Sequence, residues 1–163
     1  MLFLVFELGE GRYALDAEAV EQVLPLVRIT AIPGSPRGIA GTFNYAGSPV
    51  PVVDLVDLAL ARPAAARLDT RLIVANYPVS EGQHRRLGLI AERVTTTIRR
   101  NADEFVESGV TSPGAPYLGP VTTDAHGLIQ RIEIRKLLPA AVADVLFTDS
   151  ADKTWPSNTS NSF

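Results

Sequence analysis

The segment from Arg37 to Leu58 constrains the fold of this chain most, because it predicts a β-hairpin of unusual composition. One strand leads through a tight turn at Ala46-Gly47 into a second strand that ends at Asp54. The second strand contains Pro49 and Pro51, and proline is tolerated only at strand starts, sheet edges and bulges because it lacks an N–H donor. Such a hairpin is expected at the edge of a small barrel, which favours a docking surface over a reaction centre.

The remaining segments predict a mostly β fold with short helices and a C-terminal helix. Gly9-Glu10-Gly11 marks a tight turn between two strands. Asp16 is placed to cap a short helical piece, and Pro139 to start or kink the last helix. The predicted strands outside the hairpin are 2–8, 12–15, 70–77, 87–98, 117–123 and 128–134. The predicted helical segments are 17–23, 55–60 and 135–147. In addition, residues 26–32 are expected to be extended and residues 64–69 to form a flexible linker.

Three short blocks recur in the same order in the two halves of the chain. A duplicated module gives this pattern, so we expect two small antiparallel barrels with a groove between them. One domain is expected at 1–147, with sub-barrels at roughly 17–69 plus the C-terminal part and at 70–134, followed by a disordered tail at 148–163. The matched blocks are Tyr13-Ala14-Leu15 with Leu87-Gly88-Leu89, Ile39-Ala40-Gly41 with Tyr117-Leu118-Gly119, and Val53-Asp54-Leu55 with Ile132-Glu133-Ile134.

Composition narrows the class of protein further. The net charge of −3 argues against non-specific binding to nucleic acid, which normally needs a basic surface. Without cysteine, neither a disulfide nor a cysteine-bearing metal site can form. The short apolar start lacks the features of a signal peptide, and no apolar run approaches the roughly 20 residues that span a bilayer. We therefore expect a cytoplasmic protein without direct membrane insertion.

No constellation of catalytic or metal-binding residues emerges from the sequence, so no enzyme, cofactor or metal site is predicted. His84 and His126 each stand alone in a predicted turn. Asp54 and Asp57 have a spacing that can hold a cation when buried, but capping of the following turn is the better explanation for Asp54. The Arg85-Arg86 pair could meet phosphate or an acidic partner, or could simply be solvated.

Four stretches stand in a distinctive order: LFLVFELGEGRYALDAEAVEQVL, IPGSPRGIAGTFNYAGSPVPVVDL, LGLIAERV and GLIQRIEIRKLLP. Together they resemble the CheW family of chemotaxis coupling proteins over about residues 2–147. The most specific part is the hairpin motif, Asn-x-x-Gly followed by P-x-x-D-L. The resemblance implies a non-enzymatic adaptor built from two intertwined five-stranded SH3-like barrels. It also implies recruitment to membrane receptor arrays.

The partners that the resemblance implies are the cytoplasmic tip of a methyl-accepting receptor, the regulatory domain of a CheA-type histidine kinase, and further CheW-like proteins. Family members usually carry arginine where this chain has Ala46. Losing that charge-assisted contact removes about 1.5–3 kcal/mol, so either the partner differs or binding relies on Phe43 and Tyr45. A milder departure is Glu92, where aspartate is more frequent. The stretches LGLIAERV and YLGPV resemble Wsp-type surface-sensing members, which feed a diguanylate cyclase.

An adaptor of this kind would bind through apolar side chains on strand edges and in the groove between the barrels. Because alternate residues of a strand point inward, some candidates belong to the core, and the sequence leaves open which. The rival hypothesis, a β-barrel module for nucleic acid or another ligand, requires basic and aromatic residues clustered on one strand face. The partner-binding candidates are Leu26, Ile39, Phe43, Asn44, Tyr45 and Ala46 on the first barrel and Leu87, Leu89 and Val94 on the second.

Overall fold

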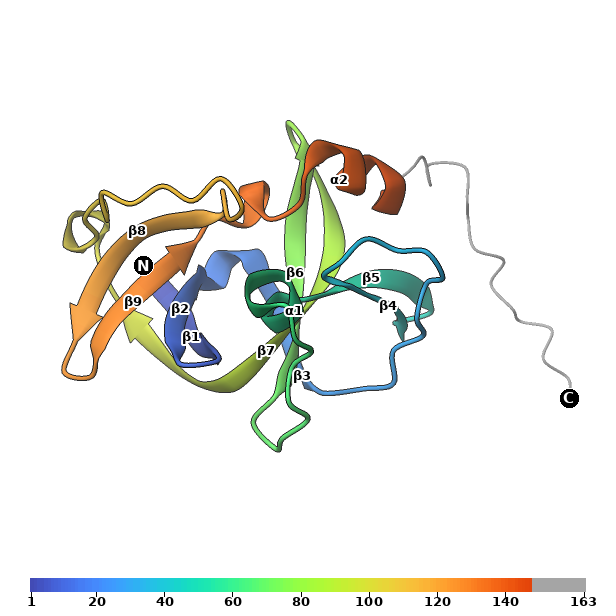
Figure 1. Cartoon of the computed structure of the whole chain (residues 1–163), viewed down its shortest axis with the longest axis horizontal. Coiled ribbons are helices and arrows are strands. Elements are labelled where there is room, and N and C mark those ends of the chain that lie inside the picture. The colour runs from blue at the N-terminus through green and yellow to red at the C-terminus, as the bar shows by residue number, and fades with distance from the viewer. Residues whose placement is uncertain (148–163) are drawn as a thin grey trace, which may run out of the picture.

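The structure, a computed structural model, describes residues 1–147, so the tail predicted to be disordered lies outside the described residues. The fold is mostly β, as predicted, with short helical segments (Figure 1). The strands are β1 (Leu2–Leu8), β2 (Gly11–Asp16), β3 (Val20–Pro25), β4 (Ile39–Tyr45), β5 (Ser48–Asp54), β6 (Arg71–Ser80), β7 (Gln83–Arg99), β8 (Leu118–Asp124) and β9 (Gly127–Ile132). The helices are α1 (Leu55–Leu60) and α2 (Ala140–Leu146), with single 3-10 turns at Ala17–Ala19, Ala102–Glu104 and Ile134–Lys136.

The long strand β7 belongs to two five-stranded barrels. Its first half pairs within the order β3-β6-β7-β5-β4, which we call the first barrel, and its second half within β7-β1-β2-β9-β8, the second barrel. Thr30, beyond β3, closes the first barrel by exchanging two backbone hydrogen bonds with Thr42 (2.8 and 2.9 Å). Val106, beyond β7, closes the second in the same way with Val121 (2.9 and 2.8 Å). The predicted pair of small barrels is confirmed.

Strand pairing supports the internal repeat and corrects one of its blocks. Val52 and Arg131 directly precede the two copies of the third block. Val52 pairs in parallel with Gly88 in the first barrel, and Arg131 pairs in parallel with Ala14, the residue matched to Gly88, in the second. The predicted match of the middle block, Ile39-Ala40-Gly41 with Tyr117-Leu118-Gly119, is wrong by one residue. Ile39 corresponds to Leu118, because these residues pair with Val53 and Ile132 respectively. Short apolar strings fit equally well in neighbouring registers, so only the pairing settles the alignment.

The two barrels interleave along the chain instead of following one another. Strand β6 and the first half of β7 pair with β3 and β5, so residues after 70 complete the first barrel. The predicted division, with roughly 17–69 plus the C-terminal part in one sub-barrel and 70–134 in the other, therefore differs from the strand pairing at β6 and the first half of β7. The hairpin β1–β2 joins the second barrel from the far end of the sequence, and a boundary drawn from consecutive repeat blocks cannot anticipate that.

The predicted turns, caps and helices agree with the structure except where strand pairing with a distant segment decides the conformation. Asp16 caps only one 3-10 turn, accepting a hydrogen bond from Glu18 N at 3.0 Å. The helix predicted over 17–23 ends there because Val20 enters the ladder with β6. The turn between β6 and β7 is the pair Glu81-Gly82, so His84, which was expected in a turn, lies in β7 and pairs with Pro78. Pro139 directly precedes α2, as expected for a helix start.

The space between the barrels is a packed core. The largest apolar cluster combines Phe6 and Leu15 from the second barrel with Val53 and Leu89 from the first. Smaller clusters around Phe43 and around Phe3 fill the separate interiors of the first and second barrels. The predicted groove is thus confined to the rim, where an open cleft of about 1220 Å³ lies between residues 76–84 of the first barrel and 15–19 and 131–136 of the second.

No helix within residues 1–147 is long and apolar enough to cross a membrane.

Candidate partner-binding surface

Burial divides the nine predicted partner-binding residues. Leu87 and Leu89 are fully buried, and Phe43 and Ile39 are 6% and 9% exposed. These side chains build the core and cannot contact a partner in this fold, so the prediction is wrong for their side chains. The reason is the strand alternation: Phe43 points into the first barrel, and its neighbour Asn44 points out.

The accessible candidates gather mainly at the tip of the β4–β5 hairpin. Asn44, Tyr45 and Ala46 are consecutive there, and Leu26 lies on the segment that follows β3. Val94 is only half-buried, but it lies in the second half of β7 and packs against the core between the barrels. The structure therefore does not unite Val94 with the hairpin residues.

The hairpin turn requires an unusual backbone conformation at Ala46. Ala46 and Gly47 have φ of 51° and 85°, the pair of positive values that a type I′ turn needs. Asn44 Oδ1 accepts a hydrogen bond from Gly47 N at 3.0 Å and holds the turn. Alanine is poorly suited to a positive φ because its Cβ crowds the backbone.

Replacing Ala46 with glycine should therefore increase the free energy of unfolding by up to about 1 kcal/mol, since glycine adopts this φ freely. Urea denaturation measures the change. Ala40→Gly in β4, at a site without positive φ, is the matched control and should be destabilising. A loss of stability in Ala46→Gly equal to that of the control would contradict the turn geometry.

Tyr45 is held in place by side chains from three strands. Its hydroxyl donates a hydrogen bond to Gln22 Oε1 on β3 at 2.7 Å. The guanidinium carbon of Arg86 on β7 lies 5.1 Å from the centre of its ring, within the range of a cation–π contact. The Phe43 ring lies 5.9 Å away. Arg86 is itself fixed by two hydrogen bonds to Glu21, of 2.8 and 3.0 Å. The Tyr45 ring is thus fixed on an accessible surface.

The sequence did not predict Gln22 and Glu21 as parts of this site, and it indicated Arg86 only as one of two adjacent cations. No local signal links β3 to β7, because the two strands meet only through β6.

Exposed apolar side chains lie in and directly after β3, the strand that supplies Gln22. Val23, Leu26 and Val27 are each 38% exposed, a high value for large aliphatic residues along one segment. We call the hairpin surface the set of Glu21, Gln22, Tyr45 and Arg86. It combines a fixed aromatic ring with a guanidinium, and aromatic residues and arginine are enriched in protein–protein interfaces.

The acidic residues near this hairpin have structural roles. Asp54 accepts hydrogen bonds from Val56 N, Asp57 N and Ala64 N at 3.0, 3.2 and 2.9 Å, so it caps α1 as predicted. Burial raises the pKa of Asp54, against the lowering effect of these backbone donors. Within residues 1–147, no three His, Asp or Glu side chains form a group that could hold a metal ion.

Phe3, Phe6 and Phe43 do not form a stacking platform for nucleic acid bases. Phe3 and Phe6 are fully buried and Phe43 nearly so, and Arg131 lies over the Phe3 ring at 5.2 Å. Base stacking requires exposed rings beside a basic track. These phenylalanines are unavailable for it.

Comparison with known proteins gives a consistent result. The model of the CheW-like domain matches residues 2–142. The chain is 27% identical to a chemotaxis protein CheW from Klebsiella aerogenes over 139 residues, covering 83% of this chain and 80% of that protein. It is 23% identical to a chemotaxis protein CheW from Treponema pallidum over 136 residues, covering 82% and 79%.

Among solved structures, the scaffolding protein TtCheW from Thermoanaerobacter tengcongensis superposes with a TM-score of 0.74 at 26% identity. The match covers 86% of this chain and 89% of that one. Proteins of this family are scaffolds and adaptors and not enzymes. On its matched sequence and its paired barrels, the chain belongs to the CheW-like domain family and is a scaffold-type coupling protein of chemotaxis signalling.

Proposed function

We propose that this protein is a cytoplasmic adaptor that couples the cytoplasmic tip of a methyl-accepting receptor to the regulatory domain of a CheA-type histidine kinase. The observation that carries the proposal is the hairpin surface, where Tyr45 is fixed by Gln22 and Arg86. Family membership supports the same role. Recruitment to receptor arrays then follows from binding the receptor and needs no membrane insertion.

A fixed aromatic side chain is an efficient anchor for a partner. Binding normally costs about 0.5–1.5 kcal/mol for each flexible side chain that becomes ordered, and Tyr45 is already ordered by its neighbours. Tyrosine and arginine are also the residues in which binding energy concentrates. We therefore place the centre of the partner interface at Tyr45.

A guanidinium from β7 lies beside the hairpin, although Ala46 supplies none and Glu21 pairs with it. Arg86 reaches the ring of Tyr45 from β7, and its ion pair with Glu21 holds the guanidinium at the surface. An acidic side chain of a partner that approaches Tyr45 would compete with Glu21 for this guanidinium. Such an exchange of partners would take the place of the contact that the missing arginine makes.

Replacing Tyr45 with alanine should weaken binding of the partner that docks on the first barrel by about 30-fold, the loss expected for a hot spot worth about 2 kcal/mol. Isothermal titration calorimetry with the purified kinase regulatory domain and with the receptor tip measures it. Leu128→Ala, at a 64% exposed site on the second barrel, is the control and should leave that affinity unchanged. Equal effects of both changes would place the interface elsewhere.

We further propose that the output is of the Wsp type, in which the kinase controls a diguanylate cyclase. Support comes from the stretches LGLIAERV and YLGPV. Deleting the gene should then change cellular cyclic di-GMP on surface contact and leave swimming unaffected. A swimming defect with unchanged cyclic di-GMP would assign the protein to flagellar chemotaxis.

Further CheW-like proteins are proposed as additional partners, and mixed pull-downs test this.

A further inference from the structure

The junction between the barrels contains a polar network centred on Glu92. Strand β7 passes from the first barrel into the second at Glu92-Arg93, where Arg93 has a φ of 46°. The pairing with β1 also slips at this point, since Val5 pairs with Thr96 and Glu7 with Glu92. A positive φ at a non-glycine residue is costly, so surrounding contacts must hold it.

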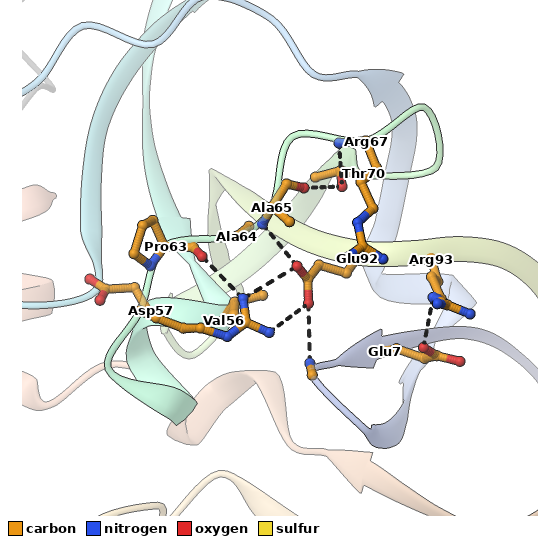
Figure 2. A network of polar contacts seen from close by, with 12 residues as sticks. Glu7, Val56, Asp57, Pro63, Ala64, Ala65, Arg67, Thr70, Glu92 and Arg93 are labelled. Carbon is orange, nitrogen blue, oxygen red and sulfur yellow. Dashed lines mark hydrogen bonds and ion pairs between the residues drawn. The ribbon is translucent and has the colours of Figure 1, made fainter.

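The Glu92 carboxylate accepts hydrogen bonds from both barrels, and Figure 2 shows it pointing between them. From the second barrel, Gly9 N in the β1–β2 turn donates to Oε1 at 3.1 Å. From the first barrel, Ala65 N in the loop after α1 donates to Oε2 at 2.8 Å. Arg62 adds contacts to Oε1 at 3.3 Å and Oε2 at 3.5 Å.

The carboxylate is ionised in this environment. Glu92 is 7% exposed, and burial alone would raise its pKa. The hydrogen bonds from Ala65, Arg62 and Gly9 outweigh burial and hold the pKa of Glu92 below its ordinary range. Hydrogen bonds to an ionised acceptor are stronger than those between neutral groups, so the two backbone segments are held firmly.

The segments that Glu92 joins are also in close steric contact. A Cβ on Gly9, whose φ is +64°, would come within 2.7 Å of Leu60 Cδ1 at the end of α1. The β1–β2 turn therefore lies directly against α1 of the other barrel. Arg93 contributes a separate ion pair, 3.2 Å from Glu7, which stays within the β1–β7 pairing.

We propose that Glu92 is a positioning residue that fixes the angle between the two barrels, by joining the β1–β2 turn of one to the loop after α1 of the other. The open cleft at the rim has walls from both barrels, residues 76–84 on one side and 131–136 on the other. Its width depends on that angle. Glu92 therefore affects the width of this cleft, although its side chain does not line the cleft.

Apolar packing between the barrels does not make this contact redundant. Burial of apolar surface is non-directional, whereas hydrogen bonds to fixed backbone donors have preferred lengths and angles. The single carboxylate of Glu92 accepts hydrogen bonds from backbone donors in both barrels. Asp54, its neighbour in the network, contacts backbone of the first barrel alone.

Double electron–electron resonance on the full chain tests the proposal. The protein has no cysteine, so Glu81→Cys in the first barrel and Thr123→Cys in the second can be spin-labelled selectively. We expect Glu92→Gln to broaden or shift the distance distribution between the labels, because an amide cannot accept from Gly9 and Ala65 through both of its ends. Glu92→Asp keeps the charge but is one methylene shorter, and we expect an intermediate distribution.

A control variant separates positioning from general loss of stability. Glu7→Gln removes the neighbouring carboxylate, whose partner Arg93 is exposed, and should leave the distribution unchanged. Hydrogen exchange supplies a second readout. In Glu92→Gln at least one of the Gly9 and Ala65 amides, the one that no longer faces an acceptor oxygen, should exchange about tenfold faster or more, while Ala64, bound by Asp54, stays protected.

An unchanged distance distribution in Glu92→Gln would overturn the proposal, even if the variant were less stable or exchanged faster. If Glu92→Gln does not fold, Glu92→Asp decides the same question. The measurement requires no partner, so its outcome is independent of the proposed adaptor role.

Discussion

Replacing Gly41 with alanine should destabilise the protein by more than about 4 kcal/mol, a size reached only when a single change disrupts the fold. The new Cβ would lie 2.0 Å from the carbonyl oxygen of Thr30, and Gly41 has a φ of +145°, which side chains rarely allow. Thr30 closes the first barrel through its two hydrogen bonds with Thr42. The clash therefore opens the barrel at its seam. Urea denaturation and soluble yield measure the effect.

Gly34→Ala is the matched control for this change. Gly34 also has a positive φ, +72°, but no atom lies within 4 Å of the position of its Cβ. The control should cost about 1 kcal/mol, the conformational penalty without the clash. Similar losses of stability at the two sites would contradict the close approach of β4 to the segment at Thr30.

Replacing Leu89 with alanine should lower the free energy of unfolding by about 2–5 kcal/mol, the range for removing a buried leucine. Leu89 is fully buried in the cluster that joins the barrels, where it shares the core with Phe6 and Val53. Because the cavity lies between the barrels, both should lose stability together. Calorimetry and circular dichroism should show one cooperative transition with a lower midpoint.

Leu26→Ala provides the comparison, because Leu26 is 38% exposed and should change stability by only about 0.5 kcal/mol or less. We propose on this basis that residues 1–147 form one folding unit. Two separate transitions in Leu89→Ala would show that the barrels fold independently. A small effect of Leu89→Ala on stability, with a large one on partner binding, would restore Leu89 as an interface residue.

The sequence was informative wherever local chemistry determines structure. Turn glycines and alternating apolar residues located the hairpins, and Asp54, the last residue of β5, was correctly predicted as a helix cap. The internal repeat predicted two barrels. These features depend on short-range rules of backbone conformation and side-chain alternation, which a single sequence records directly.

Features that depend on pairing between distant segments could not be predicted from the sequence. Nothing local indicates that β7 serves both barrels or that β1–β2 completes the second one. The same limit affected the site. Phe43 and Leu89 have the same apolar character as Leu26, and only the fold separates core from surface. The fixing of Tyr45 by Gln22 and Arg86 joins strands far apart in the chain.

The central claim, that the protein is an adaptor, is tested most directly by calorimetric titration against the receptor tip and the kinase regulatory domain encoded beside it. The adaptor role predicts measurable binding of the wild-type protein to each, with Tyr45→Ala weakening one of the two interactions. Absence of heat from both partners up to hundreds of micromolar, about −5 kcal/mol of binding free energy, would contradict it.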